Sequence, residues 1–148
     1  MRLKKYLDFE KLRILFKTFF ESQFKYCPLT WMFYSRGTNN KINRLQERAL
    51  RFVHDDYSSS FDVLLKQDKS FTIHHYNIQT LCIELYKVYN NLSQTVFSEL
   101  FTKKENPYNL RSQFDFTVPK VKTVYKGFNS LRYVGPIIWN LVPTEIKY

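Results

Sequence analysis

Glycine and cysteine are both scarce in this sequence, which argues against two kinds of binding site. The chain has 3 Gly and 2 Cys among 148 residues, so no glycine-rich loop is available to cradle the phosphates of a nucleotide. Cys27 and Cys82 lie inside apolar helical patterns, where a free cysteine behaves as a small buried hydrophobe. Neither cysteine pairs with the three histidines in a spacing typical of zinc. We therefore expect no disulfide, no metal and no cofactor.

A catalytic carboxylate cluster is also missing. Adjacent aspartates such as Asp55 and Asp56 can hold catalytic metal ions, but this pair follows a helical pattern and precedes Tyr57–Ser60. No upstream carboxylate stands in a strand to share a metal, and no serine lies in a nucleophile elbow. The pair is interpreted as turn residues that end a helix. The sequence predicts no catalytic residue, and we do not expect the chain to be an enzyme by itself.

Long apolar runs are absent as well. No segment approaches the roughly 20 apolar residues that a membrane-crossing helix needs. Met1–Tyr6 is basic and too short to hold the apolar region of a secretory signal. These observations predict an intracellular setting, in the cytoplasm or the nucleus, without a membrane partner or a small-molecule ligand.

Basic residues, in contrast, are abundant and unevenly placed. The formal net charge is +10. Residues 1–53 carry +8, from 12 basic and 4 acidic residues, residues 54–101 carry −3, and residues 102–148 carry +5. If the two basic ends meet, they form the positive face that is typical of a nucleic-acid binder. A basic surface that serves only solubility is the alternative.

Apolar residues recur with helical spacing over most of the first hundred positions, which predicts a bundle of about four to six helices. Asp8 is the expected N-cap of the first helix, and Pro28 interrupts it. The helical segments expected after this break are Leu29–Tyr34, Asn40–His54 with Thr38 or Asn39 as its cap, a short helix through Phe61 and Leu65, Thr72–Leu92, and a short helix after Ser93.

The helix expected at Asn40–His54 combines two faces. Its apolar side holds Ile42, Leu45, Ala49, Phe52 and Val53, whereas four cations share another side: Lys41, Arg44, Arg48 and Arg51. Such a row can lie along a phosphate backbone, because each cation neutralises one phosphate and releases counterions. An ordinary solvated helix face is the alternative. These four residues are the candidate nucleic-acid-binding site.

The pattern changes after Thr102. A polar loop is expected at Lys103–Arg111, then strands at 114–118, 121–126 and 131–134, a break at Gly135-Pro136 and a short helix at 137–141. The predicted fold class is therefore α+β and mainly α, with a helical bundle followed by a small C-terminal antiparallel β element and a short helix. We expect a helical region at 1–101 and a small β-rich region at 102–148, packed together as a single compact unit.

Five stretches in order resemble one known family. Ser22–Arg36 with Asn40–Val53, then Tyr57–Ser70, Ile73–Ser93, Asn109–Gly127 and Val134–Lys147 are similar to the C-terminal part of reverse transcriptases from non-LTR (LINE-type, jockey-like) retrotransposons. In that family the polymerase motifs lie in fingers and palm segments that precede this region. None of those motifs is present here.

The resemblance implies a post-palm, thumb-like helical region that grips template and primer without catalysing the reaction. The implied partners are RNA or an RNA–DNA hybrid, and the missing polymerase palm. Two alternatives stay open. The chain is a helical scaffold or protein-interaction module, or it is a degenerate relic without independent biochemical activity.

Overall fold

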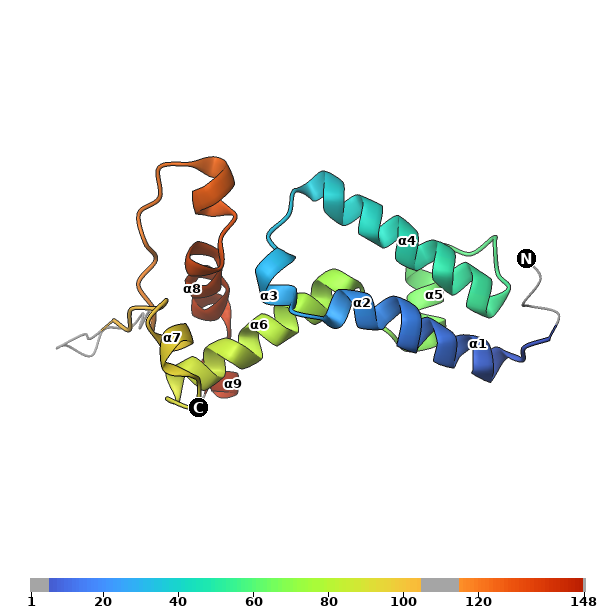
Figure 1. Ribbon diagram of the computed structural model, residues 1–148, viewed down its shortest axis with the longest axis horizontal. Helices are drawn as coiled ribbons and strands as arrows, with labels where there is room; N and C mark the ends of the chain where they lie inside the picture. The colour runs from blue at the N-terminus through green and yellow to red at the C-terminus, as the bar shows by residue number, and fades with distance from the viewer. Residues whose placement is uncertain (1–5, 105–114, 148) are drawn as a thin grey trace. The chain divides into compact units, whose positions relative to one another are not determined.

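Helices form nearly all the regular structure of this chain in the computed structural model, which describes residues 6–104 and 115–147 (Figure 1). Contacts divide the chain into two compact units, Met1–Asn77 and Ile78–Tyr148. The division expected between residues 101 and 102 stays a prediction. In chain order the elements are α1 (Phe9–Leu15), the π-helical η2 (Phe16–Glu21), α2 (Ser22–Lys25), α3 (Pro28–Trp31), α4 (Arg36–His54), α5 (Phe61–Asp68), α6 (Ile73–Tyr89), α7 (Thr95–Ser98), the π-helical η3 (Val124–Phe128), α8 (Leu131–Leu141) and α9 (Thr144–Lys147).

The predicted C-terminal β element is wrong. Within 6–104 and 115–147 there is no strand, and a single bridge between Lys103 and Phe116 is the only β pairing. The start of the expected strand at 114–118, and most of the expected loop at Lys103–Arg111, lie outside the described residues. The fold of the described chain is therefore helical and not α+β.

Two of the expected strands are replaced by helix. The segment 121–126 is extended only as far as Thr123, after which η3 begins. The segment 131–134 is the first turn of α8, with Ser130 in extended conformation as its N-cap. Gly135 and Pro136 do not break the chain but lie inside α8, where they are buried on the same face as Trp139. Burial of this helical stripe outweighs the hydrogen bond that proline removes.

The extended segment at Phe116 is held by backbone hydrogen bonds on one edge and by a side chain on the other. On one edge, the backbone N–H of Lys104 donates to the carbonyl of Asp115 at 3.0 Å, and that of Thr117 donates to Thr102 at 2.9 Å. On the other edge, the Asn140 amide accepts from the N–H of Phe116 at 3.4 Å and donates to its carbonyl at 3.1 Å. A side chain from α8 thus takes the place of a second strand.

In the first unit, the opening helix runs through α1, η2 and α2, and Asp8 precedes it as predicted. One line of aromatic rings follows this helix and continues past Pro28. The centroids of neighbouring rings are separated by 5.2, 5.1, 6.1 and 5.7 Å, in the order Phe16, Phe20, Phe24, Trp31 and Tyr34. Such ring pairs add to the stabilisation from apolar burial. Phe16 is buried in the core, and the four other rings are half-buried.

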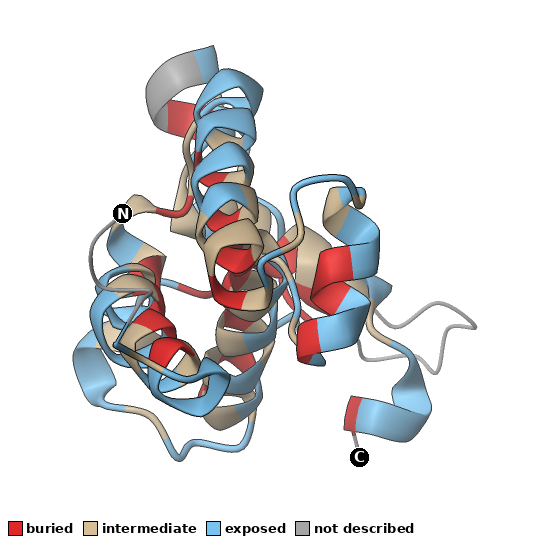
Figure 2. Cartoon of the chain, turned by 90° about the vertical axis from the view of Figure 1, so that its right-hand side faces the viewer, coloured by how far each residue is buried: buried red, intermediate tan, exposed pale blue. Residues whose placement is uncertain are grey.

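The core of the first unit lies between the opening helix, α4 and α5. Its buried members are Phe16, Leu50, Val53, Leu64 and Leu65. Buried residues form narrow bands along the helices, with exposed residues on the other faces (Figure 2). This is the arrangement that amphipathic helices adopt around one core.

A buried ion pair also joins α1 to the end of α5. Arg13 Nε donates to Asp68 Oδ1 at 2.9 Å, and Arg13 Nη2 donates to the Asp68 carbonyl oxygen at 2.8 Å. His54 Nε2, at the end of α4, lies 3.4 Å from the same carboxylate oxygen. The Asp68 side chain is fully buried, while that of Arg13 is 30% exposed. Three helices thus meet at one carboxylate.

A buried glutamine fixes the turn between α5 and α6. Gln46, on α4, has no exposed surface. Its amide donates to the carbonyl of Phe71 at 2.9 Å and accepts from the backbone N–H of Ile73 at 3.1 Å. Thr72 Oγ1 accepts from the N–H of His75 at 3.2 Å, so two side chains together cap the start of α6.

Gln46→Ala is expected to lower the free energy of unfolding by about 2 kcal/mol, because a buried carbonyl and a buried N–H both lose their partner. Urea denaturation followed by circular dichroism measures the change. Gln67→Ala is the control, since Gln67 is exposed on α5 and should shift the free energy by less than about 0.5 kcal/mol. An equal loss in both variants would contradict the role of Gln46.

In the second unit, the buried stripe of α6 includes Leu81, Leu85 and Val88. Trp139 is 2% exposed, and its Nε1 donates to Asp115 Oδ2 at 2.9 Å. Lys147 Nζ donates to the same oxygen at 2.9 Å. The described chain contains no helix that is long and apolar enough to cross a membrane.

Candidate nucleic-acid interface

The candidate interface is the outer face of α4. The helix begins four residues earlier than predicted, at Arg36, because Ser35 and not Thr38 is the N-cap; its Oγ accepts from the N–H of Thr38 at 3.4 Å. The helix ends at Asp55, whose φ of 56° is left-handed. Nineteen residues of helix therefore stand between these two caps.

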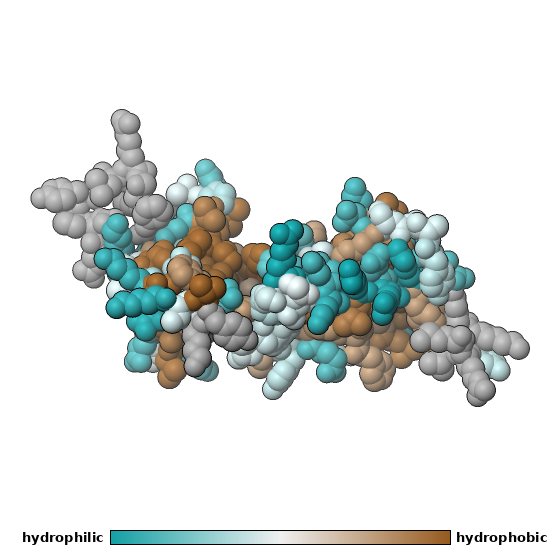
Figure 3. Space-filling model, turned by 90° about the horizontal axis from the view of Figure 1, so that it is seen from above, coloured by the Kyte–Doolittle hydropathy of each residue, from teal (hydrophilic) through white to brown (hydrophobic). Residues whose placement is uncertain are grey.

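The buried and basic faces of α4 lie opposite each other. The buried residues are Ile42, Gln46, Leu50 and Val53, and the helical period of 100° per residue places the four cations on the other side. Leu45, expected on the apolar side, is 46% exposed, and Gln46 is buried instead. Hydrophilic side chains gather along α4 in the view from above (Figure 3). The core thus holds the helix so that its basic face is outermost.

Lys41, Arg44 and Arg48 are exposed. No ion pair is recorded for any of them within 6–104 and 115–147. Seven residues separate the first from the last, so the row rises about 10 Å along the helix axis. One strand of a duplex presents a phosphate about every 3.4 Å. The row therefore has the length to meet about three successive phosphates.

Arg51 differs from the other three cations. Its Nη2 donates to Glu47 Oε1 at 2.7 Å and to the carbonyl oxygen of Ser59 at 3.4 Å, and its side chain is 32% exposed. It therefore ties the end of α4 to the following turn. The ion pair with Glu47 could have been predicted from the sequence. Glu47 precedes Arg51 by four residues, which is the favourable order for an ion pair within a helix.

Asp55 and Asp56 occupy a turn after α4. The Asp56 carboxylate accepts from the N–H and hydroxyl of Ser58 and from the N–H of Ser59, each at 3.0 Å. Hydrogen bonds from Ser59 and Ser58 hold the pKa of the Asp56 carboxyl well below its usual range. Asp56 thus shapes the turn, and the described residues contain no group of three or more His, Cys, Asp or Glu side chains that could hold a metal ion.

The cysteines and two of the histidines can be described one by one. Both cysteines are free; Cys27 is exposed, contrary to the prediction, and adopts a left-handed φ of 44° before Pro28. Burial raises the pKa of the Cys82 thiol. Burial also lowers the pKa of His74, and the neighbouring His75 lowers it further.

Comparison with known proteins adds no family to this description. No protein-family model, no curated protein and no solved structure matches the chain.

Proposed function

We propose that this chain is a non-catalytic nucleic-acid-binding region, the post-palm C-terminal part of a non-LTR retrotransposon reverse transcriptase, which grips RNA or an RNA–DNA hybrid through α4. The observation that carries the proposal is the row of three exposed cations, Lys41, Arg44 and Arg48, without recorded ion pairs in the described chain. The formal net charge of +10 and the resemblance of five sequence stretches support it.

The chemistry of such a grip is electrostatic. Each lysine or arginine that neutralises a phosphate releases condensed counterions, so the affinity falls as the salt concentration rises. This kind of contact does not read the base sequence. A row of cations that contacts phosphates alone can therefore hold a duplex of any sequence, as a template–primer grip requires.

Replacing Lys41, Arg44 and Arg48 together by alanine is expected to reduce the slope of log affinity against log salt by about 2 to 3, because three phosphate contacts are lost. The measurement is the affinity of the full chain for an RNA–DNA hybrid, titrated at several salt concentrations. Unaltered circular dichroism is expected, since all three side chains are exposed.

Two control variants sharpen this test. Lys17, Lys120 and Lys122 are also exposed, and their joint replacement by alanine removes the same charge from scattered positions, so the slope should change much less. Arg51→Ala should destabilise the end of α4 and leave the slope nearly intact, because Arg51 is engaged by Glu47 and Ser59. Equal slopes for the α4 triple variant and the scattered variant would refute the grip.

A protein-interaction module is the second candidate, and one observation favours it. The opening helix exposes large apolar side chains, with Ile14 58% and Phe19 72% exposed. Exposed apolar groups of this size are typical of docking surfaces when they form a patch. Tight binding of a separate palm fragment, together with weak and salt-insensitive binding of the hybrid, would support this candidate over the grip.

A further inference from the structure

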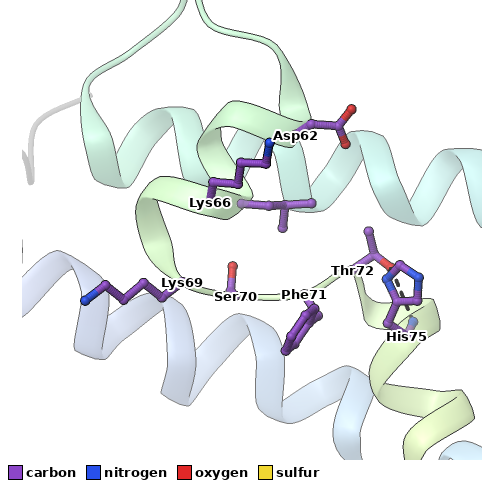
Figure 4. Close-up of a pocket in the computed structure, with 8 residues that line it drawn as sticks. Asp62, Lys66, Lys69, Ser70, Phe71, Thr72 and His75 are labelled. Carbon is purple, nitrogen blue, oxygen red and sulfur yellow. Dashed lines mark hydrogen bonds between the residues drawn. The ribbon is translucent and has the colours of Figure 1, made fainter.

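A hollow of about 530 Å³ lies at the turn between α5 and α6 (Figure 4). We call it the α5–α6 hollow. Pockets for small molecules commonly measure 300–1,000 Å³, so a ligand of the size of one nucleotide fits the space. All the residues that line it belong to the first unit, and none comes from α4. They are Asp62, Leu65, Lys66, Lys69, Ser70, Phe71, Thr72 and His75.

Phe71 is the unusual member of this lining. Its side chain is 61% exposed, although its backbone is held by the fully buried Gln46. The ring makes edge contacts with His75 at 6.4 Å and with Tyr76 at 6.0 Å, both near-perpendicular. These contacts restrict the ring, so a rigid aromatic side chain is presented to the hollow. A flat aromatic ligand can stack on such a ring with little loss of conformational entropy.

Two cations line the same hollow as this ring. Lys66 and Lys69 line the hollow, and no ion pair is recorded for either in the described ranges. Lys69 and His75 lie on opposite sides of Phe71 in Figure 4. Lys69 adopts a left-handed φ of 54° at the end of α5, where glycine is the ordinary residue. A strained cation at the edge of a hollow is consistent with a binding role.

Hydrogen-bonding groups complete the lining. Thr72 Oγ1 accepts from the backbone N–H of His75 and lies 2.9 Å from His75 Nδ1. Thr72 thus engages Nδ1 of His75, and the other ring nitrogen, Nε2, can take part in a further hydrogen bond. Ser70 Oγ is buried and has no hydrogen-bond partner in the structure. A carboxylate, Asp62, supplies an acceptor.

We propose that the α5–α6 hollow binds one unstacked nucleotide of a single-stranded nucleic acid, with the base on Phe71 and the phosphate near Lys66 and Lys69. Proteins hold single strands by combining aromatic rings, on which bases stack, with cations that contact the backbone, and this hollow has both among its lining residues. The hydroxyl of Ser70, the imidazole of His75 and the carboxylate of Asp62 offer hydrogen bonds to the base edge or the sugar. A purely apolar ligand would leave these groups and both lysines unused.

This site is separate from the row on α4 and does not require it. A mononucleotide is too short to bridge two surfaces, so its affinity depends on the hollow alone. The α4 triple variant should therefore bind adenosine monophosphate as the unchanged chain does. Failure of the grip and failure of the nucleotide site are thus distinguishable.

The test uses the full chain with two probes, adenosine monophosphate followed by NMR titration and a uridylate hexanucleotide followed by calorimetry. Phe71→Ala is expected to weaken both by about five- to 150-fold, the range for loss of one stacked base. Phe71→Trp should keep or increase the affinity. Lys69→Gly should weaken binding while it raises the midpoint of thermal unfolding, because glycine relieves the left-handed backbone.

Phe19→Ala is the matched control, because Phe19 is a phenylalanine of the same unit that is also largely exposed, at 72% against 61% for Phe71. It should change the affinity less than twofold. The proposal is overturned if Phe71→Ala binds as tightly as the unchanged chain, if Phe19→Ala weakens binding equally, or if inorganic phosphate competes as well as the nucleotide does. In the last case the lysines hold an anion and the ring holds nothing.

Discussion

Trp139→Ala is expected to lower the free energy of unfolding of the second unit by about 4 kcal/mol, within the range for truncating a buried aromatic residue. Its ring packs 6.1 Å from Phe116 and 5.9 Å from Tyr89, measured between centroids. Lys147 Nζ lies 5.5 Å from the centre of the same ring. The substitution therefore opens a cavity and also removes the N–H that donates to Asp115.

Two further variants separate these contributions. Trp139→Phe keeps one aromatic ring and removes the donor together with part of the buried volume, so a smaller loss of about 2 kcal/mol is expected. Leu141→Ala is the control on the same helix, because Leu141 is 78% exposed, and its effect should stay below about 0.5 kcal/mol. The measurement is urea denaturation followed by circular dichroism. A Trp139→Ala loss no larger than that of Leu141→Ala would show that the Trp139 contacts are not stabilising.

Asp68→Ala is expected to destabilise the first unit by about 3 kcal/mol. Breaking a buried ion pair by removing one partner commonly costs about 3–5 kcal/mol, because the other charge is left without compensation. The lower end applies here, since the Arg13 side chain is 30% exposed and water can reach it. Arg13 also keeps its hydrogen bond to the backbone carbonyl of residue 68.

A double-mutant cycle isolates this interaction. Arg13→Ala and Asp68→Ala are measured alone and together by urea denaturation, and the coupling energy is expected to exceed about 1 kcal/mol. Asp62→Ala is the control, because Asp62 is an exposed acid on the same helix. Additive effects of the two single substitutions would mean that the pair contributes nothing of its own.

Helical periodicity in the sequence predicted most of the helices but not their ends, since the segment expected at Leu29–Tyr34 is helical only over Pro28–Trp31. The helix expected at Thr72–Leu92 is present as α6, Ile73–Tyr89, and ends earlier than predicted. Burial of one helix face repeats every 3.6 residues and leaves a clear trace in the sequence. The burial of Gln46 could not be predicted in this way, because a polar residue type gives no sign that its side chain will be buried.

The C-terminal prediction failed for a physical reason. Alternation at Phe116 and its neighbours shows that a segment is extended, but it does not show what pairs with the backbone. Here the partner is the Asn140 side chain, 24 residues away. Leu131–Val134 is only four residues long and contains Arg132, so its pattern is too short to separate strand from helix.

The candidate site was predicted in part. The spacing placed Lys41, Arg44 and Arg48 on the face of α4 that the structure leaves exposed. Engagement of Arg51 by Ser59 could not be foreseen, since it depends on how the turn after α4 folds back. Phe71 was missed because its exposure is set by the hydrogen bonds of Gln46, which come from another helix.

The pairing of Asn140 with Phe116 has a consequence for assembly. Phe116 lies in a short extended segment, and extended segments with free backbone groups can recruit other chains by edge-to-edge hydrogen bonding. Both edges of the backbone at this point are already occupied, one by Thr102 and Lys104 and the other by an amide side chain. Neither edge of the backbone at Phe116 is therefore free to pair with a strand of another chain.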